Sequence, residues 1–413
     1  MPAGSPPTPP APWRVSRHGR RLAPSVIATA LREAAAGGAI SLAAGCPAAE
    51  ALPVEQTLGV IDGVLSSPGA LQYTDTSGLP ALRAWIAGQE SHRTGRPVDV
   101  TQILVTHGSQ QGLDLVCRAL LDPGDTVLVD RPSYSGALQL LGLHQARVHD
   151  VPIAADPELT ALTRALEEHA STRIVYVVPS FANPTGASLR IGQRARLGQL
   201  AERHGCVVVE DDPYRELGFT PRGPDPDAPV AAFSERVITL GSFSKVLSPA
   251  ARTGYLCAPQ SLAPLLGRLK EATDLGNSAL TQLLVHAWIT TPGLLDDQLA
   301  RLRGIYRERR DILTAAVRAH LGDALSFTVP EGGFFLWARL TDGDDTQALL
   351  TGALREGMAF VPGAAFYARA PDTSTLRLSY AAAGPGEMAE GCARLARALD
   401  RLRAPARRGE GRR

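Results

Sequence analysis

The chain has 413 residues, of which 44% are hydrophobic and 20% charged, as is typical of a soluble globular protein with two or three domains. Its net charge of +1 provides no broad electrostatic field, so we expect neither nucleic acid nor a membrane surface as a partner. No apolar run is long enough to span a bilayer. The Pro-rich start, residues 1–12, lacks the apolar core of a secretory signal, and we therefore expect a cytoplasmic location.

The five cysteines are widely and irregularly spaced. They form no CxxC pair, and no Cys/His cluster has the spacing of a zinc site. The spacing predicts buried thiols in a reducing compartment and no metal site.

In chain order, the sequence predicts five parts: a disordered arm (1–12), an N-terminal segment that packs on the small domain (13–50), a large domain (51–292), a small domain (293–403) and a disordered tail (404–413). Residues 24–36 are a helix candidate within the second part. The composition indicates no internal repeat and no long low-complexity linker.

Within the large domain, short apolar runs predict strands at residues 103–106, 127–129, 174–178, 207–209 and 237–240. Amphipathic stretches between them predict helices at residues 110–121, 134–143 and 191–204. Strands that are apolar on both faces are typical of a mostly parallel sheet covered by helices, so the predicted class is α/β. After residue 292 the pattern favours a smaller α+β domain, with helices at 293–320 and 387–402 and strands at 334–338 and 376–379.

Lys245 ends the segment 237–245 (VITLGSFSK), which is a strand followed by small polar residues. A partly desolvated lysine can lose its proton and form an imine with an aldehyde, which an arginine cannot do. Lysine is scarce among the 42 Lys and Arg residues, and this favours a chemical role over an ordinary surface position. Arg252, Ser242 and Ser244 lie nearby and would suit a phosphate, although Arg252 alone would more commonly form a surface ion pair.

Other polar residues also follow predicted strands. The turn 106–113 (THGSQQGL) could hold a phosphate on the first N–H groups of a helix, and it matches neither the Walker motif nor GxGxxG. Taken alone, such a turn is usually only a helix cap. One of Glu210, Asp211 and Asp212 could pair with a protonated ring nitrogen, and the residues alone leave open which. Asn183 could bond a ligand oxygen or simply form a turn, and Arg377 could bind a carboxylate with two hydrogen bonds or simply cap the sheet.

In this order, the segments resemble the fold-type I pyridoxal 5'-phosphate (PLP) enzymes of the aspartate aminotransferase superfamily. They are most similar to the class I/II aminotransferases related to 2-aminoadipate and kynurenine aminotransferases, and to the aminotransferase domains of MocR-type regulators. The resemblance runs from about Ile40 to Leu402. It is carried by residues 72–78 (QYTDTSG), 108–111 (GSQQ), 131–134 (RPSY), 183–186 (NPTG), 210–214 (EDDPY), 242–245 (SFSK), 330–337 (PEGGFFLW) and 375–380 (TLRLSY).

The resemblance implies a role for each matching residue. Lys245 would form the Schiff base and move the proton, Asp211 would pair with the pyridine nitrogen, and Tyr214 and Asn183 would bond the phenolic oxygen. Tyr134 would stack on the ring. The phosphate would be held by Gly108, Ser109, Gln110, Ser242, Ser244 and Arg252, and by Tyr73 across a homodimer interface. The substrate would be bound by Arg377, which clamps the α-carboxylate, and by Asn183, Gly45 and Arg21.

Three local departures bear on the substrate. Cys46 stands where relatives often have a larger apolar residue, and Ser77 stands where they often have Glu. The segment 249–252 (PAAR) replaces the usual Pro-Gly-x-Arg. None of the three departures removes a catalytic group, but Cys46 and Ser77 lie where side chains could select the shape of a substrate.

The sequence leaves the reaction open between two PLP chemistries. The leading hypothesis is a transaminase of amino-acid metabolism or biosynthesis that moves an α-amino group to a 2-oxo acid with ping-pong kinetics. The alternative is an enzyme of specialised metabolism that uses the same quinonoid for β- or γ-elimination, replacement, cyclisation or annulation. A PLP-sensing regulator is disfavoured, because about 40 residues precede the first shared motif, too few for a DNA-binding module. Neither the amino donor nor the acceptor follows from the residues.

Overall fold

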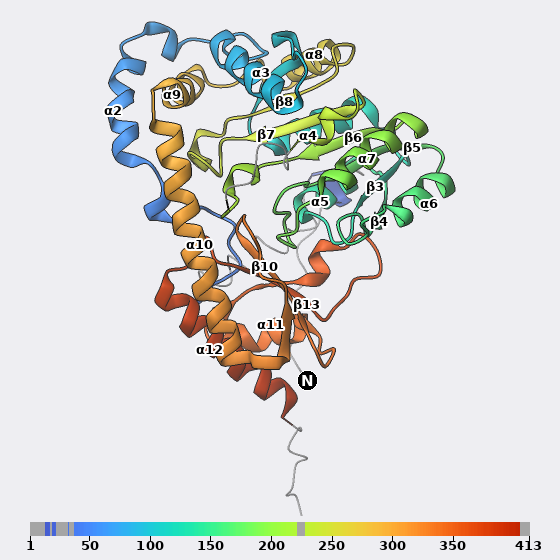
Figure 1. Ribbon diagram of the computed structural model, residues 1–413, viewed down its shortest axis with the longest axis vertical. Helices are drawn as coiled ribbons and strands as arrows, with labels where there is room; N and C mark the ends of the chain where they lie inside the picture. Colours follow the sequence, from blue (N-terminus) through green and yellow to red (C-terminus); the bar gives the residue numbers. More distant parts are fainter. Residues whose placement is uncertain (1–12, 17–18, 22–31, 33–36, 221–227, 405–413) are drawn as a thin grey trace, which may run out of the picture.

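The computed structural model describes residues 13–16, 19–21, 32, 37–220 and 228–404 (Figure 1). The predicted arm, nearly all of the helix candidate at 24–36 and the tail after residue 404 lie outside the described residues. Within the described part of the chain, no helix is both long and apolar enough to cross a membrane.

A seven-stranded sheet forms the centre of the larger part of the molecule. Six of its strands run in one direction, and the remaining strand, next to one edge, is antiparallel to both of its neighbours. The predicted mostly parallel sheet is thus confirmed. In spatial order the strands are β2 (Ile103–Thr106), β8 (Gly254–Cys257), β7 (Val237–Ser242), β6 (Val207–Asp211), β5 (Thr172–Val177), β3 (Thr126–Asp130) and β4 (Arg147–Val151).

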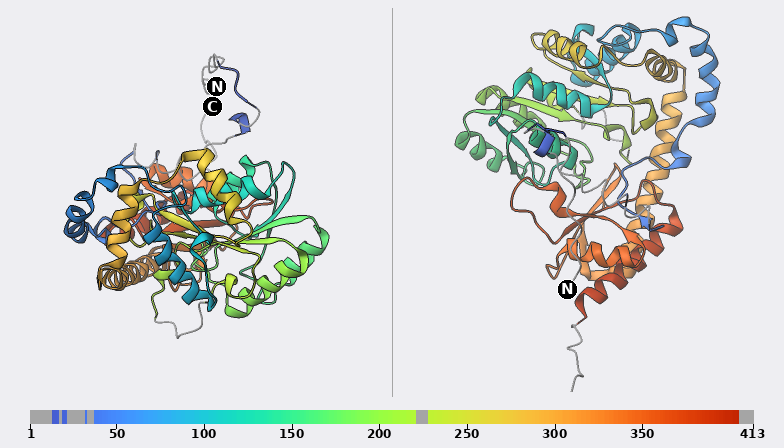
Figure 2. Two further views of the ribbon diagram at one scale, coloured as in Figure 1. Left: turned by 90° about the horizontal axis from the view of Figure 1, so that it is seen from above. Right: turned by 180° about the vertical axis from the view of Figure 1, so that it is seen from behind.

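Helices cover both faces of this sheet, as Figures 1 and 2 show. Alternate strand residues point to opposite faces, so each strand contributes to two apolar cores. Val127 and Val129 pack with helices α4 (Ser109–Leu120), α5 (Ser135–Leu143) and α8 (Ala263–Asp274). Leu128 packs with α6 (Thr160–Glu168) and α7 (Ile191–His204) on the other face. Three more helices, α2 (Val54–Leu65), α3 (Pro80–Thr94) and α9 (Ala279–Thr290), lie beside the β2 edge.

The C-terminal part contains a four-stranded antiparallel sheet, in the order β12 (Val361–Pro362), β13 (Thr375–Ser379), β10 (Phe335–Leu340) and β9 (Leu325–Phe327). Strand β1 (Ile40–Ser41) pairs in parallel with β11 (Met358–Ala359). The helices of this part are α10 (Leu294–Leu321), α11 (Thr346–Arg355) and α12 (Pro385–Arg403). The predicted helices at 293–320 and 387–402 are confirmed within two residues, whereas the domain boundaries stay a prediction.

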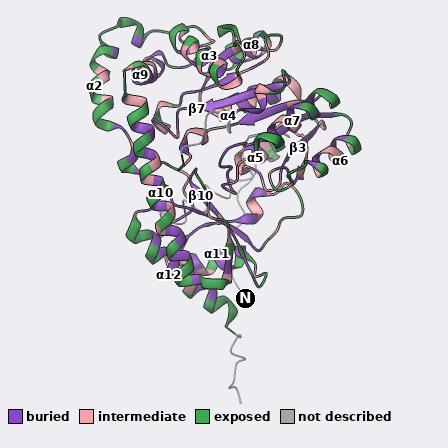
Figure 3. Cartoon of the chain, in the orientation of Figure 1, coloured by how far each residue is buried: buried purple, intermediate pink, exposed green. Residues whose placement is uncertain are grey.

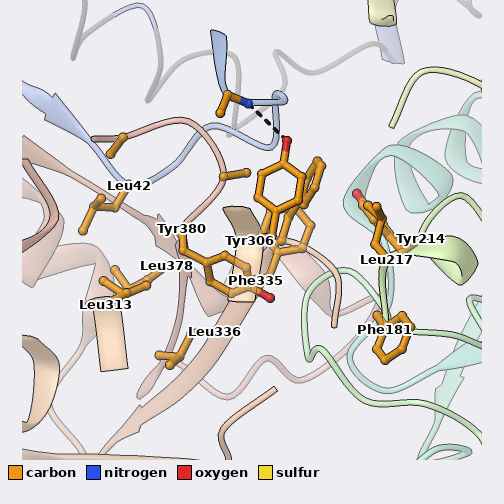
Figure 4. Close-up of a cluster of buried hydrophobic side chains, with 14 of the residues drawn as sticks. Leu42, Phe181, Tyr214, Leu217, Tyr306, Leu313, Phe335, Leu336, Leu378 and Tyr380 are labelled. Carbon is orange, nitrogen blue, oxygen red and sulfur yellow. Dashed lines mark hydrogen bonds between the residues drawn. The ribbon is translucent and has the colours of Figure 1, made fainter. Parts of the chain in front are cut away.

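The largest apolar core lies where the two parts of the molecule meet, and the buried residues there appear purple in Figure 3. Figure 4 shows Tyr214 and Phe335 in this core, together with Tyr306 from α10. The Tyr306 hydroxyl accepts a 3.2 Å hydrogen bond from the backbone N–H of Ala48. This bond ties the segment after β1, which includes Gly45, to helix α10.

Candidate active site

A cavity of about 330 Å³ lies where β5, β6 and β7 end, between the two sheets. Ligands of open α/β sheets commonly bind beyond the carboxyl ends of the parallel strands, because polar loops from several strands meet there. Thirteen of the predicted site residues line this cavity: Gly45, Gly108, Ser109, Gln110, Tyr134, Asn183, Asp211, Tyr214, Ser242, Ser244, Lys245, Arg252 and Arg377.

Lys245 reaches into the cavity from the connection between β7 and β8. Its Nζ donates a 3.0 Å hydrogen bond to the carbonyl of Gly45 and lies 6.0 Å from the centre of the Tyr214 ring. Burial lowers the pKa of Lys245 below its ordinary value, and the cationic side chains of Arg377 and Arg252 lower it further. A lowered pKa leaves more of the lysine as the neutral amine near neutral pH, and the neutral amine is the form that attacks an aldehyde.

Asp211 is the last residue of β6 and is 4% exposed. Its Oδ2 accepts a 2.9 Å hydrogen bond from the Tyr176 hydroxyl, while its Oδ1 has no hydrogen-bond partner among the described residues. Burial raises the pKa of Asp211 to about 6, against the opposing effect of the hydrogen bond from Tyr176. The open oxygen of a buried carboxylate fits a protonated ring nitrogen, which would supply both a donor and a positive charge.

The other two acids of this segment do not line the cavity, which resolves the choice that the sequence left open. Glu210 points to the other face of the strand, where it accepts from the Thr239 hydroxyl and the Val230 N–H, both at 2.8 Å. Asp212 accepts a 3.1 Å hydrogen bond from the Ser180 hydroxyl. Of the three acids, only Asp211 faces the site.

The turn between β2 and α4 brings together groups that could bind an anion. Gly108 has a φ of +80°, and a Cβ at this position would lie 3.1 Å from Nη2 of Arg252. That same Nη2 donates a 2.9 Å hydrogen bond to the carbonyl of His107, which holds the guanidinium beside the N-terminus of α4. The hydroxyl of Ser244 is buried without a hydrogen-bond partner in the described part of the chain. These groups fit a phosphate.

Arg377 enters the cavity from β13 and is 1% exposed. Its Nη1 donates a 2.8 Å hydrogen bond to Oδ1 of Asn183, and its Nη2 donates a 2.6 Å bond to the carbonyl of Ala43. The guanidinium lies 4.2 Å from the centre of the Phe335 ring. Burial lowers the pKa of Arg377 to about 10, so the group stays cationic at neutral pH. A buried guanidinium in this position can bind a carboxylate.

The two tyrosines of the cavity differ in their surroundings. Tyr214 is buried, and its ring packs edge-on against Phe334 and Phe335, with centroids at 5.4 and 5.9 Å. Tyr134 lies at the start of α5 and borders the cavity from the side of the phosphate turn. Burial raises the pKa of both hydroxyls, which therefore act as neutral hydrogen-bonding groups.

One predicted site residue, Tyr73, lies outside the cavity of this chain. Tyr73 follows the short helix η3 (Pro68–Leu71) and is 85% exposed. Arg21 belongs to the short helix η1 (Gly19–Arg21), and its side chain lies outside the described part of the structure. The roles of both residues stay predictions.

The structure also adds residues that the sequence analysis did not select. Val178, Pro213 and Phe335 line the cavity. Tyr176 orients Asp211 through the hydrogen bond from its hydroxyl. Cys46 lines it as well and is exposed, so the prediction of buried thiols is wrong for this cysteine. Cys46 is exposed because it faces the cavity, and the apolar sequence of residues 43–47 gave no sign of a cavity there.

A family model for class I and II aminotransferases matches residues 39–395. The chain belongs to this family. It is 39% identical over 394 residues to a 2-aminoadipate transaminase of Thermus thermophilus, covering 92% of this chain and 95% of the relative. It is 35% identical over 369 residues to aromatic-amino-acid aminotransferase 1 of Thermococcus litoralis, covering 87% and 88%.

Solved structures agree with the family. The crystal structure of LysN, an α-aminoadipate aminotransferase of Thermus thermophilus in complex with N-(5'-phosphopyridoxyl)-L-leucine, has a TM-score of 0.84 at 36% identity. The match covers 95% of this chain and 98% of that one. The present class I/II aminotransferase is therefore an enzyme whose cofactor is PLP, as the sequence resemblance predicted. The open Oδ1 of Asp211, the unpaired hydroxyl of Ser244 and the turn at Gly108 all fit that cofactor.

Proposed function

We propose that this aminotransferase moves the α-amino group of an amino acid to a 2-oxo acid in two half-reactions, with ping-pong kinetics and Lys245 as the Schiff-base lysine. The observation that carries the proposal is the convergence of Lys245, Asp211 and Arg377 on one cavity, from three different strands or strand ends. These side chains are a nucleophilic amine, a buried carboxylate and a carboxylate-binding guanidinium. That combination matches the needs of chemistry at the α-carbon of an amino acid.

When bound, the cofactor would supply an electron sink for the electron pair that remains on Cα when the α-proton leaves. Asp211 keeps a proton on the ring nitrogen, because its burial makes an unpaired charge there unfavourable. Nζ of Lys245 would accept the proton from Cα of the substrate. Tyr214 and Asn183 would bond the phenolic oxygen of the cofactor, and Tyr134 would stack on its ring. Its phosphate would be held by Gly108, Ser109, Gln110, Ser242, Ser244 and Arg252.

The α-carboxylate of the substrate binds Arg377, which orients Cα toward Lys245. The described cavity wall carries three cationic side chains, Lys245, Arg252 and Arg377, and each already has a role in this scheme. None therefore remains in the described wall to neutralise an acidic substrate side chain. With Phe335 and the small Cys46 beside the substrate position, we infer an apolar or aromatic amino donor.

We further propose a homodimer in which Tyr73 completes the phosphate site of the partner subunit. The Tyr73 side chain is 85% exposed, and Leu71 beside it is 79% exposed. Along α2, the exposed apolar residues Val54, Leu58 and Leu65 share one face at helical spacing. An apolar face of this kind is typical of a subunit interface. The expected cytoplasmic location stays a prediction.

The test is a visible spectrum of the purified protein, followed by addition of single amino acids without an oxo acid. A band of the lysine-bound cofactor should appear in the wild type and be missing in Lys245→Ala. Conversion to the pyridoxamine form with one equivalent of oxo acid would establish transamination and identify the donor. Release of ammonia or of a side-chain fragment, with the original band restored, would instead show a different PLP reaction. A wild type without any such band would refute the proposal.

A further inference from the structure

The sequence contains two lysines, Lys245 and Lys270, and the second lies outside the cavity. Lys270 is in α8 and is 0% exposed. Its Nζ lies 2.9 Å from both carboxylate oxygens of Asp274, one helical turn later. A buried ammonium is costly unless it is paired, so the ion pair holds both side chains in one position.

Asp274 also holds the two residues that flank the phosphate turn. Its Oδ2 accepts a hydrogen bond from Nε2 of Gln111 and lies 3.1 Å from Nδ1 of His107. Oε1 of Gln111 accepts a 2.8 Å hydrogen bond from the backbone N–H of His107. The turn from Gly108 to Gln110 is thus fixed at both ends by contacts that lead back to one carboxylate.

The same carboxylate is linked to the segment that carries Tyr73. Oδ1 of Asp274 accepts a 3.0 Å hydrogen bond from the backbone N–H of Gly276. The neighbouring carbonyl of Leu275 accepts a 2.9 Å hydrogen bond from the hydroxyl of Thr76, three residues after Tyr73. Asp274 therefore connects the phosphate turn to the segment proposed to reach the partner subunit.

We infer that Lys270 and Asp274 form a positioning pair that fixes the phosphate turn and so sets how tightly the enzyme holds the phosphate of its cofactor. Neither residue lines the cavity, so the pair acts through Gln111 and His107. His107 passes the effect to Arg252, because its carbonyl accepts the 2.9 Å hydrogen bond from Nη2 of that arginine. The inference rests on the proposed phosphate role of the turn.

Hydrogen bonds from Lys270 and Gln111 lower the pKa of Asp274 against the opposing effect of burial, so the carboxylate is anionic at neutral pH. An anionic acceptor binds the Gln111 amide more strongly than a neutral one. Asp274→Asn keeps the size of the side chain and removes the charge. It therefore loosens the turn without creating a cavity.

The experiment titrates the full-length apoenzyme with PLP and, separately, with pyridoxal, which lacks the phosphate. In Asp274→Asn we expect the Kd for PLP to rise about tenfold or more, and the Kd for pyridoxal to change less than about twofold. Inorganic phosphate should protect the variant apoenzyme against heat less than it protects the wild type. Lys270→Met should have the same selective effect, and the double variant should add little to either change.

Arg118→Met is the matched control. It removes another i,i+4 ion pair, to Asp114, from α4 itself, but away from the turn. This control should leave both Kd values at the wild-type level. If Asp274→Asn does not fold, as judged by circular dichroism of the apoenzyme, Gln111→Met replaces it. That variant leaves the Lys270 pair intact and should still weaken PLP selectively.

Equal PLP affinities in wild type and Asp274→Asn would overturn the inference, as would a parallel loss for PLP and pyridoxal, which indicates general destabilisation. If the wild type itself binds no PLP, the proposed function fails first. The two failures are therefore distinguishable.

Discussion

Nη1 of Arg377 donates a 2.8 Å hydrogen bond to Oδ1 of Asn183, which connects a strand of the small sheet to the turn that follows β5 of the large one. Because Oδ1 already accepts this bond, the Nδ2 group of Asn183 is the one that can donate to a ligand oxygen. The contact therefore links the group that binds the substrate carboxylate to a group proposed to bond the cofactor.

This contact leads to the first prediction. Arg377→Lys keeps the positive charge but cannot form the two parallel bonds of a guanidinium. We expect KM for the amino donor to rise about 10- to 100-fold, with a smaller change in kcat. Steady-state kinetics with saturating oxo acid measure both. The cofactor spectrum should be unchanged, and a fall in kcat alone would argue against carboxylate binding.

The second prediction concerns how the burial of Asp211 affects the free energy of unfolding of the apoenzyme. Folding raises its pKa to about 6, so the stability that its protonated form contributes is complete below about pH 4 and lost as the pH rises through 6. Asp211→Asn should therefore stabilise the apoenzyme at pH 8, by about 1–3 kcal/mol, and have little effect at pH 4. Urea denaturation at the two pH values tests this expectation.

Activity should move in the opposite direction in the same variant. Without the carboxylate the ring nitrogen loses its anionic partner, and we expect kcat to fall about 1000-fold or more. A variant that is both less stable as apoenzyme and fully active would contradict the proposed role of Asp211.

The third prediction concerns the pH dependence of cofactor capture. Only the neutral amine of Lys245 attacks the aldehyde, and burial lowers its pKa below the ordinary lysine value of 10.5. The rate at which apoenzyme takes up PLP should therefore rise with pH through a single ionisation whose midpoint lies below 10.5. Stopped-flow absorbance measures this rate between about pH 6 and pH 10, a range that brackets the expected midpoint. A midpoint at the ordinary value would exclude a desolvated lysine.

The fourth prediction tests the shared site. Lys245→Ala and Tyr73→Ala should each be nearly inactive, because one lacks the nucleophile and the other lacks the group proposed to reach the partner's phosphate. Mixed after unfolding and refolding, they should recover up to about a quarter of the wild-type activity, since half of the dimers are hybrids with one complete site of two. Refolding each variant alone is the control. No recovery in the mixture would place Tyr73 outside the partner's site.

Much of the fold and the site could be predicted from the sequence. The buried strands of an α/β sheet appear as short apolar runs, and their polar ends identify the residues that meet at one edge. For this reason Lys245, Asn183 and the turn at Gly108 could be selected before any contact was known. Strands β4 and β8 were missed, because Arg147–Val151 is polar on its exposed positions and Gly254–Cys257 begins with glycine, which is uncommon in strands.

The sequence by itself determined the local elements, the polar residues that follow them and, through its ordered motifs, the family. Only the tertiary structure decided which of the three acids faces the cavity, that Cys46 is exposed there, and that Tyr176 orients Asp211. The link between Lys270 and the phosphate turn also comes from the structure alone, because Asp274 and Gln111 are 163 residues apart. Local patterns depend on neighbours along the chain, whereas these contacts depend on how distant segments pack.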